Sequence, residues 1–343
     1  KKILLNGLLC ITLLFTRDFH NRISVQKANT NSRATPFSSN AIISKDPKLN
    51  PYYIVGFVDA EGCFSIKLKK NKKMKLGWSI YLTFEIHLHR KDRELLTNIR
   101  EVLGRVGTIY DGSNKSILYS VGSLSEIIHT IIPFFDKYCL LSKKSIDYEL
   151  FRKAALIMDK KEHLTEKGFY QILSIKAAMR NGLTEVLAES FPNISPVFFK
   201  FNKPLPEVLN PYWIAGFTEG EGSFMIHIQK HEECKTGKAV KLKFQITQHE
   251  KDKELLNLIL MSFNCGTLIT NNNSKVFAVW KFEDVFNIII PFFQNYSLQG
   301  NKKLNFLDFI KVAHLIKNKA HLTVEGLDKI ESIKSGMHYG RDN

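Results

Sequence analysis

Residues 49–66 read LNPYYIVGFVDAEGCFSI, and residues 209–226 read LNPYWIAGFTEGEGSFMI. Eleven of these 18 positions are identical at an offset of 160 residues. In both copies Asn-Pro opens a mostly apolar run that closes at a glycine, which is the pattern of a capped helix with proline in its first turn. We therefore predict one short helix in each copy, ending at Gly62 and at Gly222.

The repeat extends well beyond these two helices. TFEIHLHRKDRELL (83–96) matches KFQITQHEKDKELL (243–256), IIPFFDKY (131–138) matches IIPFFQNY (289–296), and HLTEKGFYQILSIKAAM (163–179) matches HLTVEGLDKIESIKSGM (321–337). A period of 160 residues is far longer than that of solenoid repeats. We expect two homologous domains, 50–182 and 209–343, joined by an extended, proline-containing linker at 183–208.

Hydrophobic residues alternate strictly after each predicted helix. Phe64, Ile66 and Leu68 alternate with polar residues, and the second copy shows the same pattern. The next run, 81–87, alternates in the same way. Period-two alternation indicates antiparallel strands with one buried and one open face. Each copy is therefore predicted to be an α+β domain with the order α-β-β-α-β-β-α-α.

The composition indicates a folded protein with a polyanionic partner. The chain has 343 residues, 44% of them hydrophobic, and a formal net charge of +16. Such an excess of positive charge points to nucleic acid or an anionic membrane. No apolar run approaches the roughly 20 residues that span a bilayer, and five scattered cysteines form no CxxC pair, which argues against a zinc cluster and a disulfide framework.

The first 49 residues differ in composition from the rest. Two lysines precede a short apolar run at 3–15, and the following stretch is basic and rich in Ser, Asn and Thr. These features are typical of a targeting or fused segment, so we exclude 1–49 from the core. A tail that contributes nothing to activity is the simpler interpretation.

Small residues recur four apart in both predicted helices. They are Gly56, Ala60, Gly216 and Gly220. Glycine inside a helix costs about 1 kcal/mol relative to alanine, so close packing of the two helices is the simplest reason for it. The helix ends would then bring Glu61 and Glu221 together, where two carboxylates repel each other and both meet the negative ends of helix dipoles. A divalent cation would relieve both penalties, and oxygen ligands suit Mg²⁺, which Mn²⁺ could replace.

The two nine-residue stretches IVGFVDAEG (54–62) and IAGFTEGEG (214–222) resemble the motif of the LAGLIDADG homing endonucleases in their two-motif, single-chain form. The agreement is best with intron-encoded members of fungal mitochondria. The resemblance implies two pseudo-symmetric αββαββα domains, with the motif helices at their interface and the sheets forming a saddle along the DNA major groove. The eighth motif residue then binds the catalytic metal, which assigns Glu61 and Glu221. The sixth residues, Asp59 and Glu219, are less direct neighbours.

The resemblance also implies a basic residue beside each scissile phosphate. Alignment of 140–151 with 298–309 pairs Lys144 with Lys302, and these are the better candidates, although an ordinary surface lysine in a first helical turn remains the alternative. Gln248 matches a polar residue that the family often places near the reacting water. The first copy has Leu88 there, which implies unequal half-sites.

The implied activity is site-specific, Mg²⁺-dependent cleavage of double-stranded DNA across the minor groove, in support of intron homing. We expect a monomer acting in the mitochondrion on a long, imperfectly palindromic site. Two alternatives are an RNA maturase that assists splicing of its own intron, and a DNA-binding protein that has lost catalysis. Hairpin tips near 71–72 and 235–236 would reach the outer ends of the target. Base contacts are expected from the open strand faces: Ser65, Lys67, Lys69, Tyr81, Thr83, Glu85, His87, Ser223, His227, Gln229, Lys241, Lys243, Gln245 and Thr247.

Overall fold

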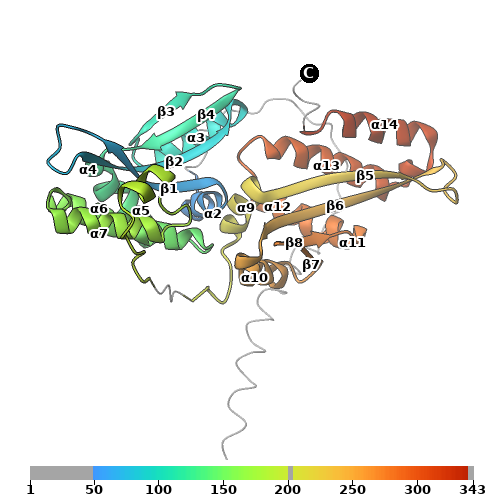
Figure 1. The fold of residues 1–343 in the computed structure, drawn as a ribbon. Helices are drawn as coiled ribbons and strands as arrows, with labels where there is room; N and C mark the ends of the chain where they lie inside the picture. The colour runs from blue at the N-terminus through green and yellow to red at the C-terminus, as the bar shows by residue number, and fades with distance from the viewer. Residues whose placement is uncertain (1–48, 200–203, 339–343) are drawn as a thin grey trace, which may run out of the picture. The chain divides into compact units, whose positions relative to one another are not determined.

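The computed structural model describes residues 49–199 and 204–338, which contain two copies of one α+β module (Figure 1). The first module comprises α2 (Pro51–Glu61), β1 (Gly62–Lys70), β2 (Trp78–His89), η2 (Arg90–Asp92), α3 (Arg93–Val102), β3 (Thr108–Asp111), β4 (Ser116–Val121), α4 (Leu124–Glu126), η3 (Ile127–Ile131), α5 (Ile132–Lys137), α6 (Lys144–Asp159), η4 (Glu162–Leu164) and α7 (Glu166–Ala178). This order confirms the predicted fold class. The N-terminal extension that the sequence suggested, residues 1–49, lies outside the described residues apart from its last position.

The second module repeats the first element by element. It comprises α9 (Pro211–Glu221), β5 (Gly222–Lys230), β6 (Lys238–His249), η5 (Glu250–Asp252), α10 (Lys253–Phe263), β7 (Thr267–Asn271), β8 (Ser274–Val279), α11 (Phe282–Asp284), η6 (Val285–Ile289), α12 (Ile290–Asn295), α13 (Lys302–Lys317), η7 (Ala320–Leu322) and α14 (Val324–Ser335). The predicted hairpin tips lie between β1 and β2 and between β5 and β6.

Each sheet has four antiparallel strands, in the orders β1-β2-β4-β3 and β5-β6-β8-β7. The predicted alternation sets the register: Phe64 lies opposite Phe84, and Phe224 lies opposite Phe244. These four rings are buried and stacked in pairs, with centroids 5.1 Å apart. Helices α6 and α13 pack on β1 and β5. The apolar face of each sheet is therefore covered, and the polar face stays open.

The predicted helix starts are confirmed. The side chains of Asn50 and Asn210 accept hydrogen bonds from the backbone N–H groups of Tyr52 and Tyr212, at 2.9 and 3.0 Å. Proline follows each cap, where its missing N–H costs nothing. Both helices end at the residue before the predicted glycine, so each strand begins one residue after a motif glutamate.

The segment expected to be an extended linker contains a short helix, α8 (Glu185–Ser190). Its Leu187 is buried against Phe169 and Leu173 of α7 in an apolar cluster that also includes Trp78. Four prolines at the far end of the segment suggested extended chain, but the apolar residues at its near end fold back onto the first module. The domain boundaries themselves stay a prediction.

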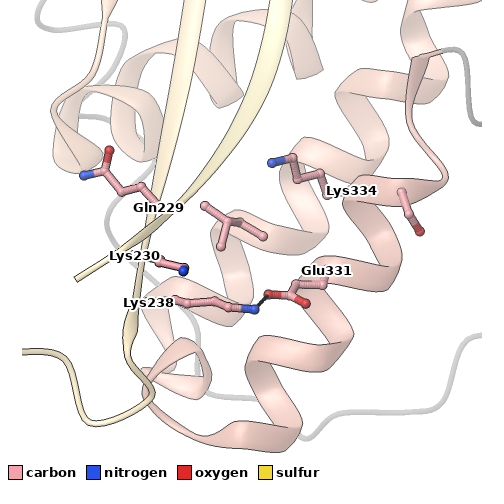
Figure 2. A pocket seen from close by; sticks show the side chains of 7 residues that line it. Gln229, Lys230, Lys238, Glu331 and Lys334 are labelled. Carbon is pink, nitrogen blue, oxygen red and sulfur yellow. Dashed lines mark hydrogen bonds and ion pairs between the residues drawn. The ribbon is translucent and has the colours of Figure 1, made fainter. Parts of the chain in front are cut away.

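The corresponding place in the second module is a cavity of about 400 Å³ between the β5–β6 hairpin and α14, with several charged residues in its lining (Figure 2). Lys230, Lys238 and Lys334 line it, and Lys238 pairs with Glu331 at 2.5 Å. The two hairpins are thus supported by different chemistry. No helix in the described part of the chain is long and apolar enough to cross a membrane.

Candidate active site at the crossing of the motif helices

The motif helices α2 and α9 pack directly on each other (Figure 1). A Cβ atom added at Gly56 would lie 2.1 Å from the carbonyl oxygen of Trp213, and one at Gly216 would lie 2.0 Å from that of Tyr53. Real Cβ atoms do not approach backbone so closely, so only glycine allows this crossing. Both glycines thus lie where the backbone of the other motif helix comes closest. At the helix ends, a Cβ at Gly220 would lie 2.3 Å from that of Ala60.

The close crossing brings the two motif glutamates into one region. A Cβ at Gly220 would lie 3.2 Å from Oε1 of Glu61, so the first carboxylate lies against the end of the helix that carries Glu221. Burial, followed by the negative charge of Glu61, raises the pKa of Glu221, and a hydrogen bond from Gln248 Nε2 at 3.1 Å opposes this rise. Glu61 thus lies beside the end of α9, where its charge acts on Glu221, and Gln248 bonds Glu221 in the same cluster.

The two candidate lysines occupy equivalent positions under these helix ends. Lys144 Nζ donates to the carbonyl oxygens of Val58 and Ala60, both at 3.0 Å. Lys302 Nζ donates to those of Thr218 and Gly220, at 3.0 and 2.8 Å.

Each lysine thus binds two carbonyls in the last turn of a motif helix, at its negative end, and one of the two also accepts the backbone N–H of the glycine that ends the helix. Burial lowers the pKa of both lysines, while nearby carboxylates, including Glu61, oppose the shift. This arrangement differs from that of a solvated lysine in a first helical turn.

Asp59 and Glu219, the sixth residues of the two motifs, are buried. They bond the loops that precede α6 and α13, which begin with Lys144 and Lys302 and are called the lysine helices below. Asp59 accepts hydrogen bonds from the backbone N–H groups of Leu141 and Ser142, both at 2.9 Å, and from the Ser142 hydroxyl at 2.6 Å. Burial raises the pKa of Asp59, and these hydrogen bonds oppose the shift. Glu219 accepts from Gln299, Gly300 and Lys302 in the same way, at 2.9 to 3.2 Å.

Each of these acids also accepts a hydrogen bond from an aromatic side chain of the other module. Trp213 Nε1 donates to Asp59 at 2.9 Å, and the Tyr53 hydroxyl donates to Glu219 at 2.8 Å. The pKa of Tyr53 is raised well above its usual value, first by burial and then by the charge of Glu219. The aromatic residues occupy the same position in the two motif helices. They therefore form a reciprocal pair of contacts across the helix crossing.

The donor set of this region suits a hard divalent cation. The motif helices supply two carboxylates, and the described residues contain no cluster of three or more His, Cys, Asp or Glu side chains that would form a complete protein cage. Mg²⁺ binds in this way, through one or two carboxylates together with water and phosphate oxygens. A structural zinc site would need nitrogen or sulfur ligands.

The residues predicted to read DNA all lie on β1, β2, β5 and β6, and none of them is buried. Ser65 lies opposite Thr83, and His227 lies opposite Lys241. Lys67 and Glu85 form an ion pair at 2.7 Å, so two of the expected base contacts are bonded to each other in the free protein.

Several side chains near the same faces were not predicted from the sequence. Trp280 is 41% exposed just after β8, and Lys243 Nζ lies 4.6 Å from its ring centroid. The matching position in the first module is Gly122, so comparison of the copies could have singled out this tryptophan. Lys176 and Arg180 line a small cavity beside Lys144. Their sequence signal was weak, because Lys176 lies in the last repeat match, 163–179, and Arg180 lies just after it.

A model of the LAGLIDADG endonuclease family matches residues 54–155 and 214–313, one stretch in each module. The chain belongs to this family. "Probable intron-encoded endonuclease 2" of Neurospora crassa is 36% identical over 301 residues, which are 84% of this chain and 65% of the relative. "Probable intron-encoded endonuclease 3" of the same fungus is 35% identical over 82% of this chain and 53% of its own length. The chain thus spans about half to two thirds of the length of these curated relatives.

Solved LAGLIDADG structures agree closely with the fold. The I-SmaMI homing endonuclease bound to cleaved DNA matches with a TM-score of 0.83 and 38% identity, over 87% of this chain and all of the matched chain. The I-LtrWI enzyme bound to target DNA matches with a TM-score of 0.81 and 40% identity, over 84% of this chain and 98% of the matched chain. The predicted homing-endonuclease fold is confirmed, including the packing of the motif helices.

Proposed function

We propose that this protein is a site-specific endonuclease that binds a long double-stranded DNA target and cuts both strands. The observation that carries the proposal is the pairing of Glu61 and Glu221 at adjacent helix ends, with Lys144 and Lys302 directly beneath. One related structure is described as bound to an uncleaved DNA target in the presence of calcium ions. Relatives of this chain are named as endonucleases, which favours cleavage over RNA splicing or binding alone. Introns of the fungal ND4 and cox1 genes encode other relatives, which supports a mitochondrial location.

We assign Glu61 and Glu221 as the ligands of a divalent cation, Mg²⁺ in preference to Mn²⁺. When bound, the metal would activate water and stabilise the leaving oxygen of a phosphodiester. Glu221 must be ionised to act as a ligand, and Gln248 favours that state by donating to its carboxylate. The protein's contribution is to hold two acids together that would otherwise repel each other.

Lys144 and Lys302 are suited to stabilise negative charge at the reacting phosphates. An ammonium group has three N–H donors, and two of them bind helix carbonyls in each module. One donor is then left for a phosphate oxygen or the attacking water. Because both lysines are fixed and largely desolvated, such a donor acts with little reorganisation.

DNA recognition is assigned to the polar faces of the two sheets. Lysines on these faces supply salt-dependent affinity through phosphate contacts, and Gln229, Gln245 and His227 are suited to base edges. The two faces differ at most positions, so the target should be imperfectly palindromic. We expect the protein to act as a monomer, because one chain supplies both halves of the site.

The proposal is tested by substituting each acid. A cleaved duplex is first selected from a random library with Mg²⁺, with Ca²⁺ as the control ion. Glu61→Gln or Glu221→Gln should lower double-strand cleavage at least about 10³-fold, because a transition-state contact is lost, while binding stays measurable. The matched control is Glu101→Gln, which removes an exposed charge on α3 that is paired with Arg105. Wild-type cleavage of both strands by either acid variant would refute the assignment.

A further inference from the structure

Two aspartates, each at the end of the short turn that follows a long strand, do not make the hydrogen bond that their local sequence suggests. Asp92 and Asp252 occupy the N-cap positions of α3 and α10, but neither side chain bonds its own helix. An aspartate at this position ordinarily accepts a hydrogen bond from the first turn of the helix that follows it. Both side chains must therefore satisfy their oxygens elsewhere.

Each carboxylate bonds the opposite module instead. Asp92 Oδ1 accepts the backbone N–H of Asn301 at 2.6 Å, and Asp252 Oδ1 accepts that of Lys143 at 2.8 Å. Lys143 and Asn301 are the N-cap residues of α6 and α13, and their own side chains make no capping bond. The backbone N–H of each N-cap residue is thus bonded by a carboxylate of the other module, which caps the helix from outside its own module.

These bonds complete the support of each lysine helix. In the first module, Asp59 accepts the N–H groups of Leu141 and Ser142, and Asp252 accepts the next one along the chain. In the second module, Glu219 accepts from Gln299 and Gly300, and Asp92 accepts from the residue after them. A carboxylate from each module therefore lies at the positive end of each lysine helix, where negative charge is favourable.

We propose that Asp92 positions Lys302 and that Asp252 positions Lys144, so that each half of the catalytic site depends on a carboxylate from the other module. Lys144 and Lys302 are the first residues of their helices, one residue beyond the bonded amide. Loss of the cap would let that turn fray and move the ammonium away from the motif carbonyls. The catalytic role of the lysines rests on the proposed function, whereas the positioning itself does not.

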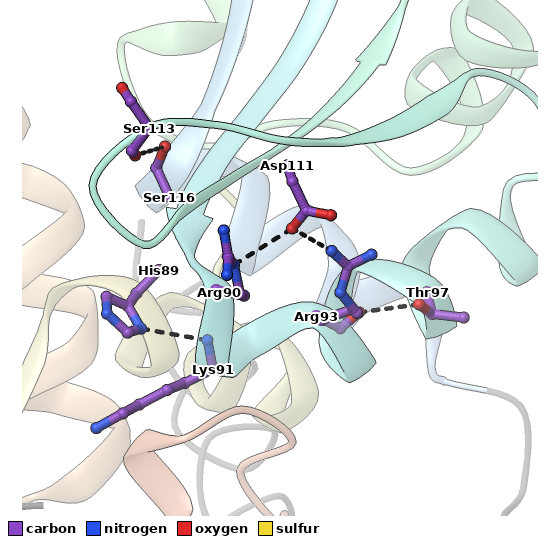
Figure 3. Close-up of polar contacts among 8 residues, drawn as sticks. All are labelled: His89, Arg90, Lys91, Arg93, Thr97, Asp111, Ser113 and Ser116. Atoms are coloured by element: carbon purple, nitrogen blue, oxygen red, sulfur yellow. Dashed lines mark hydrogen bonds and ion pairs between the residues drawn. The ribbon is translucent and has the colours of Figure 1, made fainter. Parts of the chain in front are cut away.

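A neighbouring ion pair supplies the matched control. Arg90 and Arg93 both pair with Asp111 on β3, all within the first module (Figure 3). Asp111 is half exposed, and the two arginines flank Asp92 in the chain. Asp111→Ala therefore removes a carboxylate from the same corner without removing a contact to the second module.

Amide hydrogen exchange on the full chain, without DNA, tests the positioning. Asp92→Ala should speed exchange at 299–303 about tenfold and leave 141–145 unchanged, and Asp252→Ala should do the reverse. Asp92→Asn keeps an acceptor oxygen but loses the charge, so the same one-sided change should be about threefold. If the alanine variant does not fold, the asparagine variant decides. Asp111→Ala should change neither loop.

Strand-resolved cleavage tests the consequence. Lys302→Ala and Lys144→Ala first show which DNA strand each lysine serves. Asp92→Ala should then slow the strand that Lys302→Ala slows, by about tenfold in kcat with KM unchanged, and Asp252→Ala should slow the other strand. Three results would overturn the proposal. The first is unchanged exchange in the loop of the other module, and the second is an equal change in 141–145 and 299–303. The third is slowing of the DNA strand that the corresponding lysine variant does not slow. Exchange is measurable even if no duplex is cut, so failure of the nuclease assignment stays distinguishable.

Discussion

The two modules hold their lysine helices with different residues. In the first, Asp59 reaches Ser142, and the Ser142 hydroxyl accepts the backbone N–H of Lys144 at 3.2 Å. In the second, Gly300 replaces the serine, and the longer Glu219 accepts the N–H of Lys302 directly, also at 3.2 Å. One extra methylene in the acid thus replaces one hydroxyl in the loop. The backbone amide is satisfied in both modules, although no single residue type is required to do it.

The support of the two hairpins differs more strongly. Trp78 at the start of β2 packs into the apolar cluster formed by α7 and the linker helix α8, with its ring 5.6 Å from that of Phe191. Its counterpart on β6 is Lys238, which forms an exposed ion pair with Glu331. Apolar burial contributes more to stability than an exposed ion pair. The first hairpin should therefore be the more firmly held.

The largest expected effect tests what the modules share. Gly56→Leu and Gly216→Leu should each destabilise the protein by more than about 4 kcal/mol, because the new side chain overlaps backbone of the other helix. Urea denaturation measures the loss. Gly336→Leu is the control, since a Cβ there would lie 3.6 Å from its nearest neighbour. An unchanged melting temperature in Gly56→Leu would exclude the packed crossing, and unequal losses would show that the two sides of it are not equivalent.

The hairpins provide the next largest effect. Trp78→Ala should cost about 2 kcal/mol, because a half-buried indole leaves the apolar cluster. Lys238→Ala should cost less than about 1 kcal/mol, as is usual for an exposed ion pair. Chemical denaturation of both variants gives the comparison directly. Equal losses would mean that the linker helix does not stabilise the first hairpin more than the ion pair stabilises the second.

The elements of each module were predictable because their signals are local. Asn-Pro marks the helix start, alternating apolar residues mark the strands, and the repeat confirms each by comparison. Lys144 and Lys302 could be placed because the two copies align there. The roles of Asp92 and Asp252 could not be predicted in this way, since local sequence indicates an ordinary N-cap. Their carboxylates bond a loop that is far away in the sequence, and only the packing of one module against the other brings that loop close.

The difference between the loops can be tested by exchanging their residues. Gly300→Ser should cost about 1–2 kcal/mol, because a Cβ there would lie 2.7 Å from Glu219 Oε1 and 2.9 Å from Asp92 Oδ1. Adding Glu219→Asp recreates the pair used in the first module and should recover at least half of the loss. A double-mutant cycle measures the coupling, expected to be about 1 kcal/mol. If the losses of stability in the two single variants simply add in the double variant, the pair Asp59–Ser142 cannot replace the pair Glu219–Gly300.

The smallest expected effect concerns the site itself, where Gln248 faces Glu221 but its counterpart is Leu88. Burial raises the pKa of Glu221, so cleavage should fall as the pH drops through this raised value and the ligand becomes protonated. Gln248→Leu removes a donor that favours the carboxylate, so the pKa rises further and the acid limb of the pH–rate profile moves to higher pH, by less than about one unit. Leu88→Met is the control and should leave the limb in place. An acid limb that stays fixed in Gln248→Leu, or moves to lower pH, would show that Glu221 does not control the acid side of the reaction.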